Sequence, residues 1–396
     1  MGGGRGGAGG DDRQTEPLLG KLSESSYSSS EEQIVKRTGT AWTATAHIIT
    51  AVIGSGVLSL AWSVAQLGWV GGPAAMVVFA GVTLIQSSLL ADCYISHDPE
   101  HGAVRNRSYV DAVRFYLGEK SQWFCGFFLN FSLFGGGVVY TLTSATSMRA
   151  IQKSNCYHRE GHDATCSAGG DGYYMLAFGL AQVVLSQVPG FHDMAWLSVL
   201  AAAMSFSYSL IGFGLGVAKV IANGVVKGGI GGIALVSATQ KAWQVSQALG
   251  DIAFAYPFSS VLLEIEVYAQ PVFGLVERLM GGAEAGVVEV AMPWPSRRRR
   301  RCVNLYRLCF RTAYVAASTA LAVWFPYFNQ VVGLLGAFTF WPLAIHFPAE
   351  MYLAQKKVTP WTTRWLAIRA FSAACLVISA FASVGSAIGV FTNKTS

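Results

Sequence analysis

The sequence has little charge and carries no motif of a soluble enzyme. Of its 396 residues, 13% are charged and 52% are hydrophobic, against about 25% charged in ordinary soluble domains. It contains no G-x-S-x-G, H-E-x-x-H or G-x-x-x-x-G-K-[ST] pattern, and its histidines do not pair with cysteines or carboxylates at ligand spacing. We therefore expect no enzyme, no metal site, no cofactor and no nucleotide-driven pump, which leaves ion gradients as the energy source.

Cysteine is also scarce, and its placement is uneven. Seven cysteines without a C-x-x-C pair are too few and too scattered for a disulfide scaffold or a zinc site. Cys93, Cys125 and Cys375 lie in apolar surroundings and are expected to be small core residues. Cys156 and Cys166 bracket the polar loop CYHREGHDATC, so we expect a disulfide there if this loop lies outside the cytosol.

The long apolar runs place this chain in a membrane. Residues 1–36 are rich in Gly, Ser, Glu and Lys, which predicts a disordered cytosolic tail, and no apolar h-region follows Met1, which argues against a cleaved signal peptide. From residue 37 on, charges are clustered and leave apolar runs of about 20 residues, long enough to cross a hydrocarbon core of roughly 30 Å as helices. The predicted fold class is an all-α polytopic membrane protein.

These runs predict nine crossings. They lie at about 41–67, 70–95, 121–150, 173–188, 194–217, 242–263, 308–325, 330–352 and 365–391. Gly68-Trp69 is a tight link between the first two, and mixed apolar and charged residues between 96 and 120 suggest a short interfacial helix. The stretch 267–280 contains Pro271 and, at about 14 residues, is too short to cross, so we interpret it as a non-crossing remnant.

Basic residues set the predicted orientation. If the N-terminal tail is cytosolic and 267–280 does not cross, the cytosolic segments carry about 21 of the 28 basic residues, as the positive-inside rule requires. The cysteine loop, the loop 218–241 and the C-terminus then face outward. The arginine run at 297–301 could be a nuclear signal or a nucleic-acid patch. Beside a span, we interpret it as an anchor for anionic lipid.

Two of the predicted spans have an interruption. In the first, Gly54-Ser55-Gly56 weakens the helix around a hydroxyl. In the sixth, the interruption is expected from Gly250 to Pro257. Non-helical backbone at that depth is tolerated only where it is buried in protein or lines a wet cavity, and secondary transporters build substrate sites from such broken helices. The alternative for Gly54 and Gly56 is a glycine pair that lets two helices approach closely.

The residues at these interruptions carry a family resemblance. IGSGVLSLAWSVAQLGWVGGP (53–73) and QALGDIAFAYPFS (247–259) resemble the plant amino acid permeases of the amino acid/auxin permease family. VYAQPVF (267–273), GLLGAFTFWPLAIHFPAEMYLAQKK (333–357) and the closing SAFASVGSAIGV extend the resemblance over nearly everything from residue 37 to residue 390. The resemblance implies an inverted-repeat transporter fold of the amino acid–polyamine–organocation type. It also implies proton-coupled import of amino acids across the plasma membrane.

The resemblance further implies which residues bind substrate. The substrate carboxylate is expected at the backbone of the first interruption, formed by Ile53, Gly54, Ser55, Gly56 and Val57. The amine and side chain of the substrate are expected at the second interruption, formed by Ile252, Ala253, Phe254, Ala255 and Tyr256. N-terminal helix dipole ends suit a carboxylate, and unwound carbonyls suit an ammonium group.

This chain also departs from the family. Family members place one whole span and most of another between the end of the sixth span and the YAQPVF-like run, whereas here Glu266 joins directly to Val267. The downstream topology survives, because an even number of crossings is removed, but the second repeat loses elements that should pack against both broken helices. Two functions stay open: a proton-coupled symporter, or a shortened non-transporting membrane protein that binds amino acids or modulates full-length permeases.

Asp251 is the one carboxylate well inside a predicted span. An ionised carboxylate there costs at least about 2.5–3.5 kcal/mol, so it needs a partner, water or a proton. One hypothesis is proton coupling, in which protonation of Asp251 accompanies substrate binding. The alternative is a structural aspartate that accepts N–H bonds from the unwound segment or caps the half-helix after it.

Overall fold

A computed structural model describes most of the chain after residue 40. The described residues are 41–54, 56–93, 95–98, 102–106, 108–161, 166, 170–187, 195–224, 228–234, 237–256, 287–290 and 301–395. The features of the sequence named above that lie outside them are the predicted tail at 1–36, Ser55, residues 257–266 with the junction at Glu266, the stretch 267–280 and the arginines at 297–300.

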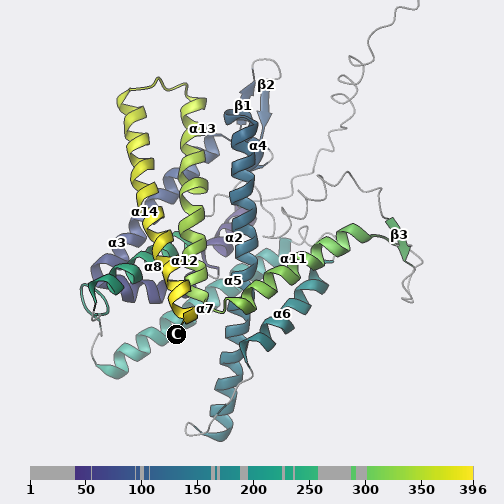
Figure 1. The fold of residues 1–396 in the computed structure, drawn as a ribbon, viewed down its shortest axis with the longest axis vertical. Helices are drawn as coiled ribbons and strands as arrows, with labels where there is room; N and C mark the ends of the chain where they lie inside the picture. The colour runs from purple at the N-terminus through teal and green to yellow at the C-terminus, as the bar shows by residue number, and fades with distance from the viewer. Residues whose placement is uncertain are drawn as a thin grey trace, which may run out of the picture. The chain divides into compact units, whose positions relative to one another are not determined.

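Helices account for nearly all of the described residues, in agreement with the predicted all-α polytopic class (Figure 1). They are α2 (Ala41–Val52), α3 (Val57–Asp92), α4 (Tyr109–Leu117), α5 (Glu119–Glu160), α6 (Asp171–Ser186), α7 (Ala195–Asn223), α8 (Ala238–Ala255), α11 (Leu305–Trp324), α12 (Phe328–Thr339), the π-helix η2 (Phe340–His346), α13 (Phe347–Gln355) and α14 (Thr363–Thr395).

Two short antiparallel hairpins, which the sequence analysis does not predict, complete the described elements. Strand β1 (Ile95–Asp98) pairs with β2 (Gly102–Arg105), and β3 (Val287–Val290) pairs with β4 (Arg301–Asn304). The first hairpin lies directly after α3, and α4 follows it in the polar segment where a short helix is predicted.

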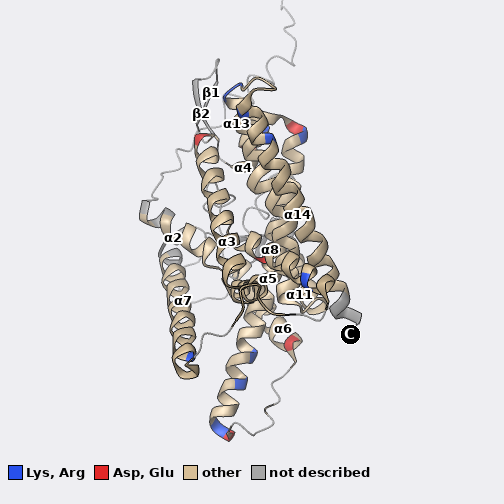
Figure 2. Cartoon of the chain, turned by 90° about the vertical axis from the view of Figure 1, so that its left-hand side faces the viewer, with Lys and Arg blue, Asp and Glu red and all other residues tan. Residues whose placement is uncertain are grey.

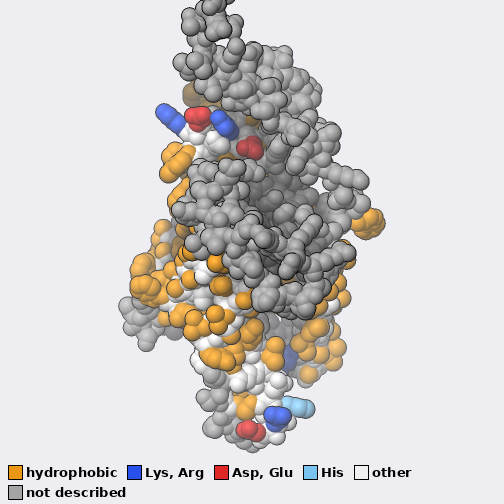
Figure 3. All heavy atoms as spheres, turned by 90° about the vertical axis from the view of Figure 1, so that its right-hand side faces the viewer, with side chains coloured by type: hydrophobic (Ala, Val, Ile, Leu, Met, Phe, Trp, Pro, Cys, Tyr) orange, Lys and Arg blue, Asp and Glu red, His pale blue; other side chains and the backbone are white. Residues whose placement is uncertain are grey.

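Five helical segments among the described residues are long and apolar enough to cross a membrane. They are Val57–Asp92, Glu119–Glu160, Val199–Asn223, Phe328–Gln355 and Thr363–Phe391, and Leu308–Trp324 is apolar but shorter. Lys, Arg, Asp and Glu residues stand mostly near the helix ends (Figure 2), and hydrophobic side chains cover much of the described surface between them (Figure 3). This distribution suits helices surrounded by lipid, while the count of nine crossings stays a prediction.

The first predicted span is divided as its glycines suggest. Helix α2 ends at Val52 and α3 begins at Val57, so Gly54 and Gly56 lie between two helices. Helix α3 then bends at Gly68, whose φ of 82° and ψ of −176° are conformations that glycine alone adopts readily. The loop 228–234 packs on this bend, where the Trp69 N–H donates to the Gly229 carbonyl at 3.2 Å.

Helix α8 lies at the centre of the packing that concerns the site, because α3, α12 and α14 all pack against it. Its closest neighbour is α12. A Cβ added to Gly336 would overlap the carbonyl oxygen of Gly250, and a Cβ added to Gly250 would overlap the carbonyl oxygen of Gly333. Glycine at these positions therefore lets the two backbones approach closely. Cys93, Cys125 and Cys375 are buried, as core residues should be.

The predicted interruption of the sixth span from Gly250 onward is wrong. Helix α8 does not unwind at Gly250 but stays helical through Ala255, and Tyr256 is its C-cap. The missing side chain of Gly250 serves close contact with α12 instead of breaking the helix. Residues 257–263, where the predicted span continues, lie outside the described residues.

Candidate functional site

The gap between α2 and α3 meets the end of α8. Gly56 is buried, and a Cβ on it would lie 2.9 Å from the Cα of Ala255, 3.1 Å from its Cβ and 3.2 Å from the Cδ1 of Phe254. The two stretches assigned to substrate binding, 53–57 and 252–256, are thus in contact at Gly56 and Ala255.

Opposite helix poles come together at this contact. Helix α3 starts here with Gly56 as its N-cap, and a glycine has no side chain with which to cap it. The Val57 N–H donates to the Gly54 carbonyl at 3.3 Å, which closes a single tight turn. Helix α8 ends here, and the last four carbonyls of a helix have no partner further along the same helix. A positive pole beside a negative pole suits a ligand that carries both a carboxylate and an ammonium group.

Two tyrosines from other helices flank the gap. The Tyr208 hydroxyl, on α7, donates to the Ile53 carbonyl and also lies 3.4 Å from the Gly54 carbonyl oxygen. The Tyr140 hydroxyl, on α5, would lie 3.3 Å from a Cβ on Gly54. Neither tyrosine is predicted from the sequence as a site residue, because a tyrosine in a span ordinarily indicates packing or an interface position.

Most side chains of residues 252–256, the second stretch predicted to bind substrate, pack in two different apolar clusters. Ile252 and Ala253 are buried in an apolar cluster with Phe79, Phe340, Ala344, Ile345, Val82 and Cys375, and Tyr256 packs against that cluster. Phe254 packs instead against Val139, Val332 and Leu335. At Ile252 and Ala253, therefore, the backbone is the part available at the helix end. Ser55 lies outside the described residues.

Asp251 is fully buried, and a hydroxyl of another helix binds it. The Ser63 Oγ, on α3, donates to Asp251 Oδ2 at 3.0 Å. Oδ1 has no hydrogen-bond partner among the described residues, and neither does the Ser386 Oγ on α14. A Cβ added to Gly333, on α12, would lie 2.9 Å from the Oδ1 of Asp251 and 2.8 Å from the Oγ of Ser386. Four helices thus enclose a small polar cluster, and the described partner of Asp251 is a serine hydroxyl, not backbone N–H of an unwound segment.

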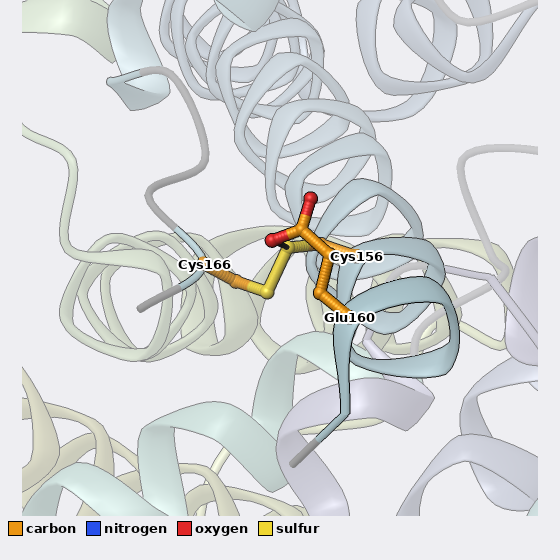
Figure 4. The surroundings of a disulfide bond; sticks show 3 residues. All are labelled: Cys156, Glu160 and Cys166. Atoms are coloured by element: carbon orange, nitrogen blue, oxygen red, sulfur yellow. Dashed lines mark hydrogen bonds between the residues drawn. A yellow bond between two sulfur atoms is a disulfide. The ribbon is translucent and has the colours of Figure 1, made fainter. Parts of the chain in front are cut away.

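Cys156 and Cys166 form a disulfide, with their Cα atoms 5.9 Å apart. Figure 4 shows Glu160, on the same helix as Cys156, beside the sulfur pair. These three residues stand at a spacing that could suit a metal ion. Because the two sulfurs are bonded to each other, they are not thiolate ligands, and the geometry is that of a structural crosslink.

Known proteins match this chain from residue 37 to residue 392. The model of the family described as transmembrane amino acid transporter protein matches residues 37–268 and 260–392. The chain is 42% identical to Probable amino acid permease 7 of Arabidopsis thaliana, over 92% of this chain and 95% of that protein. It is 41% identical to Amino acid permease 3 (91% and 92%) and 26% identical to Lysine histidine transporter-like 6 (89% and 90%). No solved structure matches.

The same comparison bears on the junction at Glu266 and Val267. The alignment with Probable amino acid permease 7 runs over 445 positions, more than the 396 residues of the chain, so it must contain gaps in this chain. The two segments matched by the family model meet at residues 260–268. Both findings agree with a segment of the relatives that is absent here between the sixth predicted span and the YAQPVF run.

Proposed function

The chain belongs to the transmembrane amino acid transporter family, and on that premise we propose that it is a proton-coupled symporter that imports amino acids across the plasma membrane. Its relatives are named as permeases, and the family is one of transporters, not enzymes. Within this chain, the proposal is supported by the contact between Gly56 and Ala255, which brings the start of α3 next to the end of α8.

In this proposal, the amino acid lies across the two helix ends. Its carboxylate binds at the backbone of Ile53–Val57, close to the start of α3. Its ammonium group binds the carbonyls of the last turn of α8, from Ile252 to Ala255. Tyr208 supports the site, because its bond to the Ile53 carbonyl fixes the end of α2.

Asp251 is the proposed proton carrier. It is buried one turn before the end of α8, and its described partner is the neutral hydroxyl of Ser63. A proton bound to the carboxylate removes the cost of a charge at that depth. We propose that protonation on the outer side accompanies substrate binding and that release of the proton inside accompanies substrate release. The energy source is then the proton gradient, without a cofactor, and the predicted orientation places the N-terminus in the cytosol.

An electrical measurement in cells that lack endogenous amino acid uptake tests this function. The full chain is expressed, single neutral and basic amino acids are added, and membrane current is recorded between pH 5 and pH 8. An inward current that needs the amino acid and grows as the outside pH falls is the expected result. Saturable uptake without any pH dependence would remove proton coupling and leave amino acid transport.

A second candidate function is favoured by the gaps in the alignment. A chain that lacks part of the second repeat could bind amino acids, or associate with full-length permeases, without transporting. The same cells distinguish it: purified protein that binds a labelled amino acid, while the expressing cells show neither uptake nor current, is the result expected from this alternative.

A further inference from the structure

We propose that Ser63 is a positioning residue that transmits the protonation state of Asp251 to the gap between α2 and α3. The inference rests on the proposed function, because it takes Asp251 as the proton carrier. It adds a mechanism by which a proton on one helix changes the backbone that receives the substrate on another.

The first observation is that the Ser63 hydroxyl has two acceptors and one proton. Its Oγ lies 3.0 Å from Asp251 Oδ2 and 3.0 Å from the carbonyl oxygen of Ser59, one turn earlier in α3. A serine hydroxyl donates a single hydrogen but can also accept. It can therefore satisfy only one of these two oxygens at full strength at any time.

The charge of Asp251 decides which oxygen receives that hydrogen. When the carboxylate is ionised, a charged acceptor outcompetes a carbonyl, so Ser63 donates to Asp251. When Asp251 takes up a proton on Oδ2, that O–H donates to the Ser63 Oγ, and the Ser63 hydrogen turns to the Ser59 carbonyl. One proton enters at Asp251, one hydrogen bond reverses, and a second forms within α3.

The second observation is that Ser59 connects directly to the gap. Its own Oγ donates to the Gly56 carbonyl at 2.8 Å, and its N–H donates to the same oxygen at 3.2 Å. Ser59 and Ser63 have no exposed surface, and Gly56 is buried. Hydrogen bonds in such surroundings are strong and polarise one another. A run of bonds thus joins Asp251 to the residue that caps α3.

The surroundings of Asp251 offer it no described ion pair. Helix α3 carries one charged residue, its last, and α12 carries none. On α8, the Lys241 Nζ binds two backbone carbonyls near the other end. The remaining titratable groups on the elements that pack against α8 or its apolar cluster are Asp92 on α3, Arg364, Arg369, Cys375 and Lys394 on α14, His346 on η2 and Tyr256, the C-cap of α8.

Hydrogen–deuterium exchange of the purified full chain tests the inference without requiring transport. We compare backbone exchange over residues 52–60 between pH 5 and pH 8, corrected for the intrinsic pH dependence, in wild type and in Ser63→Ala, Ser63→Thr and Ser87→Ala. Wild type should show a step in corrected protection, and Ser63→Thr, which keeps the hydroxyl, should keep it. Ser87, also on α3, donates to the Thr83 carbonyl and makes no hydrogen bond with Asp251 among the described residues, so Ser87→Ala should behave like wild type.

Ser63→Ala should lose the step, and in cells that show proton-coupled uptake its pH midpoint should move upward by about one pH unit, because the ionised carboxylate has lost its donor. Infrared titration of the protonated carboxyl band, assigned with Asp251→Asn, separates the two proposals. A band that titrates while Ser63→Ala keeps the step overturns the role of Ser63. A wild type without any carboxyl titration overturns Asp251 as the proton carrier instead.

Discussion

Gly56 lies against Ala255, with room for a hydrogen but not for a methyl group. A Cβ at position 56 would stand 2.9 Å from the Ala255 Cα, which belongs to backbone that cannot move aside easily. The contact sets the start of one helix beside the end of another, and the proposed substrate site depends on this spacing.

Gly56→Ala should therefore abolish most transport. Overpacking of this kind costs about 1–3 kcal/mol, and here the strain falls on both helix ends of the site. We expect amino acid uptake to fall by about tenfold or more at equal surface expression. Gly81→Ala, on α3, is the matched control, because no atom of the described residues lies within 4 Å of a Cβ at Gly81. Equal loss in the two variants would contradict a special role for the contact.

Gly336→Ala should destabilise the protein as a whole. Its Cβ would overlap the Gly250 carbonyl oxygen and lie 2.5 Å from the Phe254 nitrogen, so α12 would have to move away from α8. A loss of about 1–3 kcal/mol is expected, measured as a lower unfolding temperature of detergent-purified protein. Gly212→Ala, on α7, should leave that temperature unchanged, because a Cβ at Gly212 would have no neighbour within 4 Å in the described part of the chain. If both variants melt like wild type, the close crossing of α8 and α12 is not the packing that holds them.

Asp251→Asn should remove the dependence of uptake on pH. Asparagine has nearly the same shape and accepts a hydrogen bond from Ser63, but it cannot take up a proton at these pH values. Uptake by wild type is expected to rise as the outside pH falls from 8 to 5, whereas the variant should show a flat profile and no current induced by a neutral amino acid. A variant with unchanged pH dependence would leave Asp251 with a structural role alone.

The local part of the site could be predicted from sequence, because its signals are local. Two glycines around a serine weaken a helix wherever they stand, and the gap between Val52 and Val57 lies there. Gly250 shows the limit of this reasoning. A glycine in a helix either breaks it or lets a neighbour approach, and the choice depends on Gly333 and Gly336, which no local pattern connects to it.

Ser63 could not be found from sequence for a similar reason. Its hydroxyl bonds back to the carbonyl one turn earlier, as the hydroxyls of Thr83 and Ser87 on the same helix also do. Only the approach of Asp251, 188 positions later, distinguishes it. Asp251 itself can be identified from the sequence, because a single carboxylate inside an apolar span needs a partner, water or a proton.

The disulfide gives a test of the predicted orientation. If the loop between Cys156 and Cys166 faces outward, Cys156→Ser frees the Cys166 thiol on the outer side of the cell. A membrane-impermeant maleimide should then label intact cells that express this variant and spare cells that express wild type. Labelling only after the cells are permeabilised would reverse the predicted orientation. Because the closed loop is short, the variant should lose about 2–3 kcal/mol of stability.

Lys241 should hold the bend of α3 in place. Its Nζ donates to the Gln66 carbonyl at 2.5 Å and to the Ile233 carbonyl at 2.9 Å, and so ties α8 to the turn before Gly68 and to the loop 228–234. A cation at the end of a helical segment satisfies carbonyls that have no helical partner.

Lys241→Met keeps the length and the apolar stem of the side chain but removes the donor, which should cost about 1–3 kcal/mol because a carbonyl is left unsatisfied. Faster backbone exchange confined to residues 66–70 and 228–234, together with a lower unfolding temperature, is the expected result. Lys219→Met, at an exposed position on α7, is the control and should change neither quantity. If exchange in these two segments stays at the wild-type rate in Lys241→Met, the bend is held by Gly68 and the loop backbone alone, and Lys241 contributes only its charge.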